Sequence, residues 1–181
     1  AVFKNNANFK ILFSPEQGLI IRDLILWFIN CGDSKYRLDK GPYLYGSFGT
    51  FKTELMLLFQ KFAEQNKLRK RFEFVNIEGQ YTKAVAESDF DMVMPNVYLN
   101  RCFDEFGRRI LVLNRYGNQV LVNDAIIEAR YQRFKQYGQI SMFISNFDPN
   151  HAKTVLSPVA FDRLLEMAQS ISWPGESMRK L

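Results

Sequence analysis

The sequence predicts an α/β protein with a mainly parallel sheet. Apolar strand-like runs alternate with helical patterns along the chain, an order typical of this class. Two of the runs, residues 109–113 and 140–145, are apolar almost throughout, as expected for strands buried on both faces. A third run, residues 40–46, leads into a glycine turn that resembles a phosphate-binding loop.

The totals fit one globular domain over residues 1–181. The chain is 47% apolar and 24% charged, and its 181 residues are enough for one sizeable core. Residues 1–10 are polar and Asn-rich, so we expect a loosely ordered entry segment there. The net charge of +5 permits a nucleic-acid partner without requiring one.

Several classes of site are excluded by composition. Cys31 and Cys102 are not in C-x-x-C spacing and His151 is the single histidine, which argues against a zinc site and against Ser-His or Cys-His catalysis. Two buried thiols in a reducing compartment are expected, and therefore a cytoplasmic protein. The longest apolar run, residues 19–31, is too short and too charged to span a membrane.

The first half of the chain contains two predicted helices. Ser14 is a capping residue followed by proline, which starts a helix from residue 15 to about 30. Its expected buried stripe is Leu19, Ile20, Leu24, Trp27 and Phe28. Residues 40–46 form a short buried strand, and residues 54–67 form an amphipathic helix.

The second half continues the alternation. We expect strands at 72–77, 109–113, 140–145 and 171–173, and helices at 81–90, 124–137 and 158–169. Residues 91–98 contain a proline and remain ambiguous between helix and strand.

The candidate nucleotide site is the turn between the first strand and the second helix. It departs from the pattern G-x-x-x-x-G-K-[ST] at one position, where phenylalanine replaces the second glycine. In such loops, backbone N–H groups and a helix N-terminus face a polyphosphate. The residues are Gly46, Ser47, Phe48, Gly49, Thr50, Phe51, Lys52 and Thr53.

A second candidate site is the basic run that follows the second helix. Lys67, Arg69, Lys70 and Arg71 place four positive charges within five residues. The run is either a solvated helix end, where cations complement the helix dipole, or a patch that contacts the phosphates of single-stranded DNA.

The order of these signals resembles the AAA+ ATPase domain of the DnaC/IstB-like helicase-loader group, over roughly residues 9–180. The matching pieces are residues 40–46 (KGPYLYG), 127–131 (IEARY), 144–146 (ISN), 161–167 (FDRLLEM) and 175–179 (GESMR). The resemblance implies a three-layer α/β/α P-loop fold.

The resemblance also implies roles for individual residues. Lys52 matches the lysine that neutralises the β- and γ-phosphates, and Thr53 matches the hydroxyl that helps to hold magnesium. Asn146 matches the sensor position, with a strand-end polar cap as the alternative. Arg163 matches the arginine offered to a neighbouring subunit's γ-phosphate, with a surface salt bridge as the alternative. Arg179 is a further, poorer match to a phosphate-sensing arginine.

Two departures from the family pattern predict a degenerate ATPase. Phe51 restricts φ where glycine would let the loop bend close to the phosphates, so we expect a closed or reshaped loop. The family's central strand ends in two acidic residues, and here Asn114 and Arg115 stand in their place. Neither side chain can supply the charge that orders magnesium or accept a proton from water.

Three functional hypotheses follow from this sequence. The first, which we favour, is a binding or regulatory module of DNA replication or of a mobile element, with weak or no ATP hydrolysis. Its expected partners are a replicative helicase or another AAA+ subunit, and single-stranded DNA. The second is an active helicase-loading ATPase with an unusual loop, and the third is a structural protein that binds neither nucleotide nor DNA. ATP or ADP, with or without magnesium, is the expected ligand in the first two.

Overall fold

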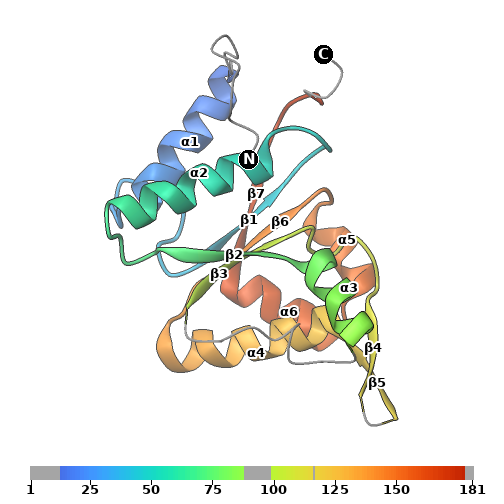
Figure 1. Cartoon of the computed structure of the whole chain (residues 1–181). Helices are drawn as coiled ribbons and strands as arrows, with labels where there is room; N and C mark the ends of the chain where they lie inside the picture. Colours follow the sequence, from blue (N-terminus) through green and yellow to red (C-terminus); the bar gives the residue numbers. More distant parts are fainter. Residues whose placement is uncertain (1–12, 88–98, 116, 178–181) are drawn as a thin grey trace.

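The computed structural model describes residues 13–87, 99–115 and 117–177, and Figure 1 shows their arrangement. The entry segment 1–10, the ambiguous residues 91–98 and Arg179 lie outside the described residues. A five-stranded sheet runs through the middle of the described chain in the order β2-β3-β6-β1-β7, and every neighbouring pair in it is parallel. Its strands are β1 (Gly41–Tyr45), β2 (Phe72–Asn76), β3 (Asn100–Asp104), β6 (Ser141–Ser145) and β7 (Ala168–Ser172).

Helices cover both faces of this sheet, which confirms the predicted three-layer α/β/α architecture. Figure 1 shows α1 (Pro15–Phe28) and α2 (Lys52–Gln65) together on one face. The other face carries α3 (Ile77–Glu87), α4 (Val122–Tyr137), α5 (Pro149–Val155) and α6 (Pro158–Met167). Each interface has its own hydrophobic cluster, because strands that are apolar on both faces supply side chains to both layers.

The start of α1 forms as the sequence predicts. The Ser14 hydroxyl accepts a hydrogen bond from the backbone N–H of Gln17, and the Gln17 side chain accepts one from the backbone N–H of Ser14. This capping box satisfies donors that the first helical turn leaves unpaired. The expected buried stripe is confirmed except at Leu19, which is 57% exposed on the outer face of the helix.

The prediction that residues 109–113 form the buried centre of the sheet is wrong. Strand β4 (Val112–Arg115) pairs antiparallel with β5 (Asn118–Leu121) in a separate two-stranded hairpin. The apolar run fits this hairpin because only alternate side chains are buried: Leu111 and Leu113 pack into the core, whereas Ile110 is 56% exposed. The position in the sheet that we expected for residues 109–113 is taken by β3, which lies between β2 and β6 and ends at Asp104.

The two cysteines differ in their burial. Cys102 is buried in β3, whereas Cys31 is only partly buried after α1, and both are free thiols. Within the described ranges, the helices are too short or too polar to cross a membrane.

Candidate functional site

The phosphate-loop candidate, residues 46–53, joins the end of β1 to the first turn of α2 (Figure 1). The carboxyl ends of parallel strands meet at this edge of the sheet, which is where α/β proteins bind ligands. Gly46 is required at the start of the loop, because a Cβ atom there would lie 2.2 Å from the carbonyl oxygen of Trp173. Gly49 has a φ of 70°, in the left-handed region that favours glycine.

Phe51 holds the backbone conformation that glycine adopts easily. Its φ is 73° and its ψ is 14°, so the residue before Lys52 is left-handed although it carries a side chain. The ring packs against the hydrophobic cluster that α1 and α2 share with the sheet. We expected the side chain of Phe51 to keep φ out of the range that glycine adopts. In the structure, Phe51 nevertheless has the left-handed conformation.

Lys52 is buried at the head of α2, with its ammonium group inside the loop. Its Nζ atom donates to the carbonyl oxygens of Gly46 (2.8 Å) and Ser47 (2.7 Å), and lies 3.3 Å from Thr50 Oγ1. It also donates to Asn146 Oδ1 at 3.0 Å, which ties the loop to the end of β6. The predicted lysine and the predicted sensor residue are thus brought into direct contact.

Thr53 and Asp104 form the second pair at this edge. The Thr53 hydroxyl lies 3.2 Å from both carboxylate oxygens of Asp104, the last residue of β3. Burial raises the pKa of the Asp104 carboxyl above its ordinary value, although hydrogen bonds from the Glu105 N–H and from Thr53 act against this shift. A hydroxyl beside a carboxylate supplies the hard oxygen ligands that magnesium prefers.

Glu105 follows Asp104 directly and gives this edge a second carboxylate. It has a φ of 58°, and both of its carboxylate oxygens lie 3.2 Å from the Arg108 guanidinium. Neither Asp104 nor Glu105 was among the site residues expected from the sequence. The signal that could have found them is residues 102–105 (CFDE), where two apolar residues precede an acidic pair.

Asn114 and Arg115 do not lie on the five-stranded sheet. They belong to the β4–β5 hairpin, which Figure 1 shows well away from the start of α2. Their placement at the end of the family's central strand was wrong because that strand was assigned to residues 109–113. The acid that contacts Thr53 is instead Asp104, the last residue of β3.

Arg163 lies on α6, where it is engaged within the chain. Its guanidinium pairs with the Glu128 carboxylate and stands over the Tyr131 ring, 5.1 Å from the centroid. Both partners come from α4, so these contacts join two of the helices on the same face of the sheet. The salt-bridge alternative accounts for Arg163 in this structure.

The basic run divides into exposed and buried members. It connects α2 to β2 and therefore lies at the amino edge of the sheet, opposite the phosphate loop. Lys70 is 5% exposed, and its Nζ atom donates to the Trp27 carbonyl oxygen at 2.7 Å. Burial lowers the pKa of Lys70 to about 8. The three exposed cations are Lys67, Arg69 and Arg71.

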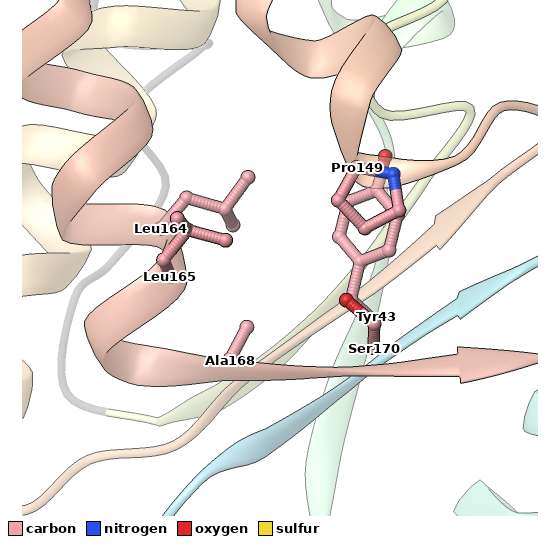
Figure 2. Close-up of a pocket in the computed structure, with 6 residues that line it drawn as sticks. All are labelled: Tyr43, Pro149, Leu164, Leu165, Ala168 and Ser170. Atoms are coloured by element: carbon pink, nitrogen blue, oxygen red, sulfur yellow. The ribbon is translucent and has the colours of Figure 1, made fainter.

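A small pocket lies on the other face of the sheet, between β1, β7 and the helices α5 and α6. Figure 2 shows Tyr43 and Pro149 on one side of it and Leu164 and Leu165 on the other. Its cavity volume of about 10 Å³ leaves room for no more than about one water molecule, and no charged side chain lines it. The phosphate loop remains the better candidate site.

Comparisons with known proteins agree with this geometry. No family model and no curated protein matches the chain. Among solved structures, the DnaC helicase loader is 12% identical with a TM-score of 0.58, and the match covers 93% of this chain and 95% of that one. DnaI is 17% identical with a TM-score of 0.58 over 94% of this chain and 87% of its own.

A third similar structure is a replication initiator, DnaA, bound to AMPPCP and single-stranded DNA. It is 14% identical with a TM-score of 0.56, and the match covers 94% of this chain but only 50% of that one. At these identities the likeness establishes the fold. The chain therefore has the fold of the AAA+ domains of helicase loaders and replication initiators, as its motifs predicted.

Proposed function

We propose that this chain binds a magnesium–adenine nucleotide at residues 46–53 and acts in DNA replication in the manner of a helicase loader. The contact between Thr53 and Asp104 carries the proposal, because it places a hydroxyl and a carboxylate beside the phosphate-binding lysine. The fold shared with DnaC supports the replication role. The DnaA structure bound to AMPPCP is precedent for a nucleotide on this fold.

The residues at this edge fit magnesium, with phosphate oxygens completing its shell. Among the described residues, no group of three or more His, Cys, Asp or Glu side chains could hold a metal by itself. Magnesium on a nucleotide needs only one or two protein oxygens, which Thr53 and Asp104 offer. When bound, the ion neutralises charge on the β- and γ-phosphates.

The protein's own groups divide the remaining work. Lys52 would exchange its contacts with the Gly46 and Ser47 carbonyls for phosphate oxygens. Asn146, 3.0 Å from the Lys52 ammonium, can donate its amide to a terminal phosphate. Glu105 is the carboxylate that could orient an attacking water, once it separates from Arg108. Asp104 at the end of β3 and Glu105 directly after it could supply the acids that we expected to be lost, and on this ground we propose hydrolysis as well as binding.

A second candidate is a nucleotide-binding module without turnover, the hypothesis that the sequence favoured. Two observations support it: Phe51 occupies a glycine position, and Glu105 is paired with Arg108. A phosphate-release assay separates the two. Steady release of phosphate from ATP that disappears in Lys52→Ala supports the active enzyme, whereas magnesium-dependent binding without release supports the module.

The test of the site itself is a thermal shift with ATP and ADP, with and without magnesium. We expect stabilisation by both nucleotides, lost in Lys52→Ala and made independent of magnesium in Asp104→Asn. Asn114→Ala is the matched control, because Asn114 is exposed on the hairpin, and should shift as the wild type does. Absence of any shift at millimolar nucleotide would contradict the proposal.

Single-stranded DNA is the proposed nucleic-acid partner, and the exposed cations Lys67, Arg69 and Arg71 are its candidate contacts. Neutralising all three should weaken binding and reduce its salt dependence, since each phosphate contact releases counterions. A triple change to glutamine at exposed lysines elsewhere (Lys61, Lys83 and Lys153) is the control for the same change of net charge. An unchanged salt slope in the triple variant would exclude this edge. A replicative helicase or another AAA+ subunit is the proposed protein partner.

A further inference from the structure

The left-handed conformation of Phe51 needs a physical explanation. At a φ of 73° a Cβ atom crowds the backbone, so glycine is favoured and a phenylalanine is strained. Such strain persists only where surrounding contacts determine the conformation. The contacts of the Phe51 ring are therefore expected to hold it there.

The Phe51 ring meets an aromatic neighbour from the entry to α1. Its centroid lies 5.9 Å from that of Phe13 at an interplanar angle of 61°, an edge-to-face arrangement. Phe13 makes a second edge-to-face contact, with Trp173 at 6.1 Å and 77°. One ring thus links the phosphate loop to the segment that follows β7.

Trp173 is itself attached to the loop. The residue is 1% exposed, its indole N–H donates to the Thr50 carbonyl at 2.6 Å, and its backbone N–H donates to the Tyr45 carbonyl at 2.7 Å. Its own carbonyl oxygen occupies the space that a Cβ atom on Gly46 would need. Trp173 therefore contacts the loop at its start and again next to Phe51.

The capping box fixes the place of Phe13. Phe13 precedes the N-cap Ser14, a position that commonly packs against the fourth helical residue, but here that residue is Gly18. Without a side chain at Gly18, the Phe13 ring packs on the loop instead. Gln17 strengthens the junction by donating its side-chain amide to the Pro174 carbonyl at 2.8 Å.

We propose that Phe13, Phe51 and Trp173 form an aromatic brace that holds the phosphate loop in its glycine-type conformation without the glycine. Phe51 and Trp173 are positioning residues in this account: they touch no phosphate and set the direction in which the loop's N–H groups point. Two edge-to-face contacts are of the same order as the cost of one left-handed residue. The consequence for nucleotide affinity rests on the proposed function, whereas the brace itself does not.

The brace can be tested without any nucleotide, by hydrogen exchange of the two indole N–H groups. Both are hydrogen-bonded, Trp173 to the loop and Trp27 to the Arg37 and Lys40 carbonyls at the opposite end of α1. In Phe13→Ala and Phe51→Ala we expect the Trp173 indole to exchange about tenfold faster while Trp27 keeps its wild-type rate. Trp27 thus reports global unfolding within the same sample. Unchanged exchange at Trp173 would overturn the brace.

Nucleotide affinity supplies the second test, through two substitutions at one position. Phe51→Ala removes the ring and keeps the strain, so its Kd for ADP should rise about tenfold, whereas Phe51→Gly removes both and should stay within about threefold of wild type. Equal affinity in Phe51→Ala and wild type, or no recovery in Phe51→Gly, would contradict the positioning role. If the wild-type protein binds neither ATP nor ADP, the proposed function fails, and the exchange experiment alone decides on the brace.

Discussion

The Thr53 hydroxyl lies 3.2 Å from each carboxylate oxygen of Asp104, and this contact joins the head of α2 to the end of β3. The two residues are 51 positions apart in the sequence and come from neighbouring parts of the sheet's carboxyl edge. Their meeting places the candidate magnesium ligands beside Lys52. The strand beside β6 that ends in an acid is thus β3, whereas residues 114–115, where the sequence analysis looked for the acids, lie in the hairpin.

Asp104→Asn should stabilise the nucleotide-free protein at neutral pH while removing the magnesium dependence of nucleotide binding. Because the pKa of Asp104 is higher in the folded protein than its ordinary 3.8, the ionised carboxylate destabilises the fold at pH 7, and this cost disappears as the pH falls below 3.8. We expect a rise of about 2–4 °C in Tm at pH 7, the shift that ~1 kcal/mol produces in a domain of this size. The rise should shrink toward pH 4.

Asn114→Asp is the control that separates the two placements of the acidic pair. If the acid that orders magnesium belongs at residue 114, this substitution would restore hydrolysis. With the acid at Asp104, we expect no change in phosphate release or in nucleotide affinity. A gain of activity in Asn114→Asp would contradict the present assignment.

The sequence predicted those parts of the fold that depend on local signals, such as helix ends and turns. The helix start at Ser14, the end of α4 at Tyr137 and the loop before Lys52 follow local signals, and each lies where it was expected. The central strand was misplaced because β3 has only two fully apolar residues, Cys102 and Phe103, between Arg101 and Asp104. The hairpin run at residues 109–113 is longer and more apolar. Pairing partners, rather than apolar length, decide which run enters the sheet.

Side-chain environments in the site were less predictable than the motif. Phe51 was read as a steric obstacle because its neighbours Phe13 and Trp173 come from opposite ends of the chain. Lys70 was grouped with three exposed cations because residues 67–71 look uniform in sequence. Its position over the Trp27 ring, 4.0 Å from the centroid, depends on tertiary packing.

Asn146→Ala should affect ATP turnover more than ADP binding. Its amide oxygen accepts from the Lys52 ammonium at the end of β6, and its proposed partner is the terminal phosphate of ATP, which ADP lacks. We expect kcat for phosphate release to fall by about 10²-fold, a usual loss for one polar group acting on a transition state, with Kd for ADP within about twofold. Equal losses in kcat and in ADP affinity would show that Asn146 only holds the loop.

Lys70 should make the stability of the protein depend on pH in the alkaline range. Its pKa is lowered from 10.5 to about 8, mainly by burial and secondly by the charge of Arg69. Below pH 8 the buried ammonium is charged, and its whole unfavourable contribution to the free energy of unfolding is present. The cost fades between pH 8 and 10.5. Relative to Lys70→Met, the wild type should gain on the order of 1–2 kcal/mol between pH 7 and 10. The gain is limited because the contacts with Trp27 favour the charged ammonium.

The measurement is urea unfolding of both proteins across this range. The difference between them isolates Lys70, because every other titrating group remains in both. A constant difference from pH 7 to 10 would show that Lys70 stays charged in the folded protein. The same variant tests the DNA model, since a buried Lys70 should contribute nothing to the salt slope that Lys67, Arg69 and Arg71 set.

Arg163 can serve a neighbouring subunit only if it leaves Glu128 and Tyr131. Arg163→Ala alone should cost less than about 1 kcal/mol in stability, because the pair is partly exposed. To test whether Arg163 acts on the nucleotide of a neighbouring subunit, the Arg163→Ala and Lys52→Ala proteins are mixed. If Arg163 has this role, each variant alone should release no phosphate. In a mixed assembly, an intact Arg163 would face an intact Lys52 pocket at some interfaces, and part of the activity should return. Wild-type activity in Arg163→Ala, or no recovery on mixing, would leave Arg163 as the ion-pair partner that joins α6 to α4.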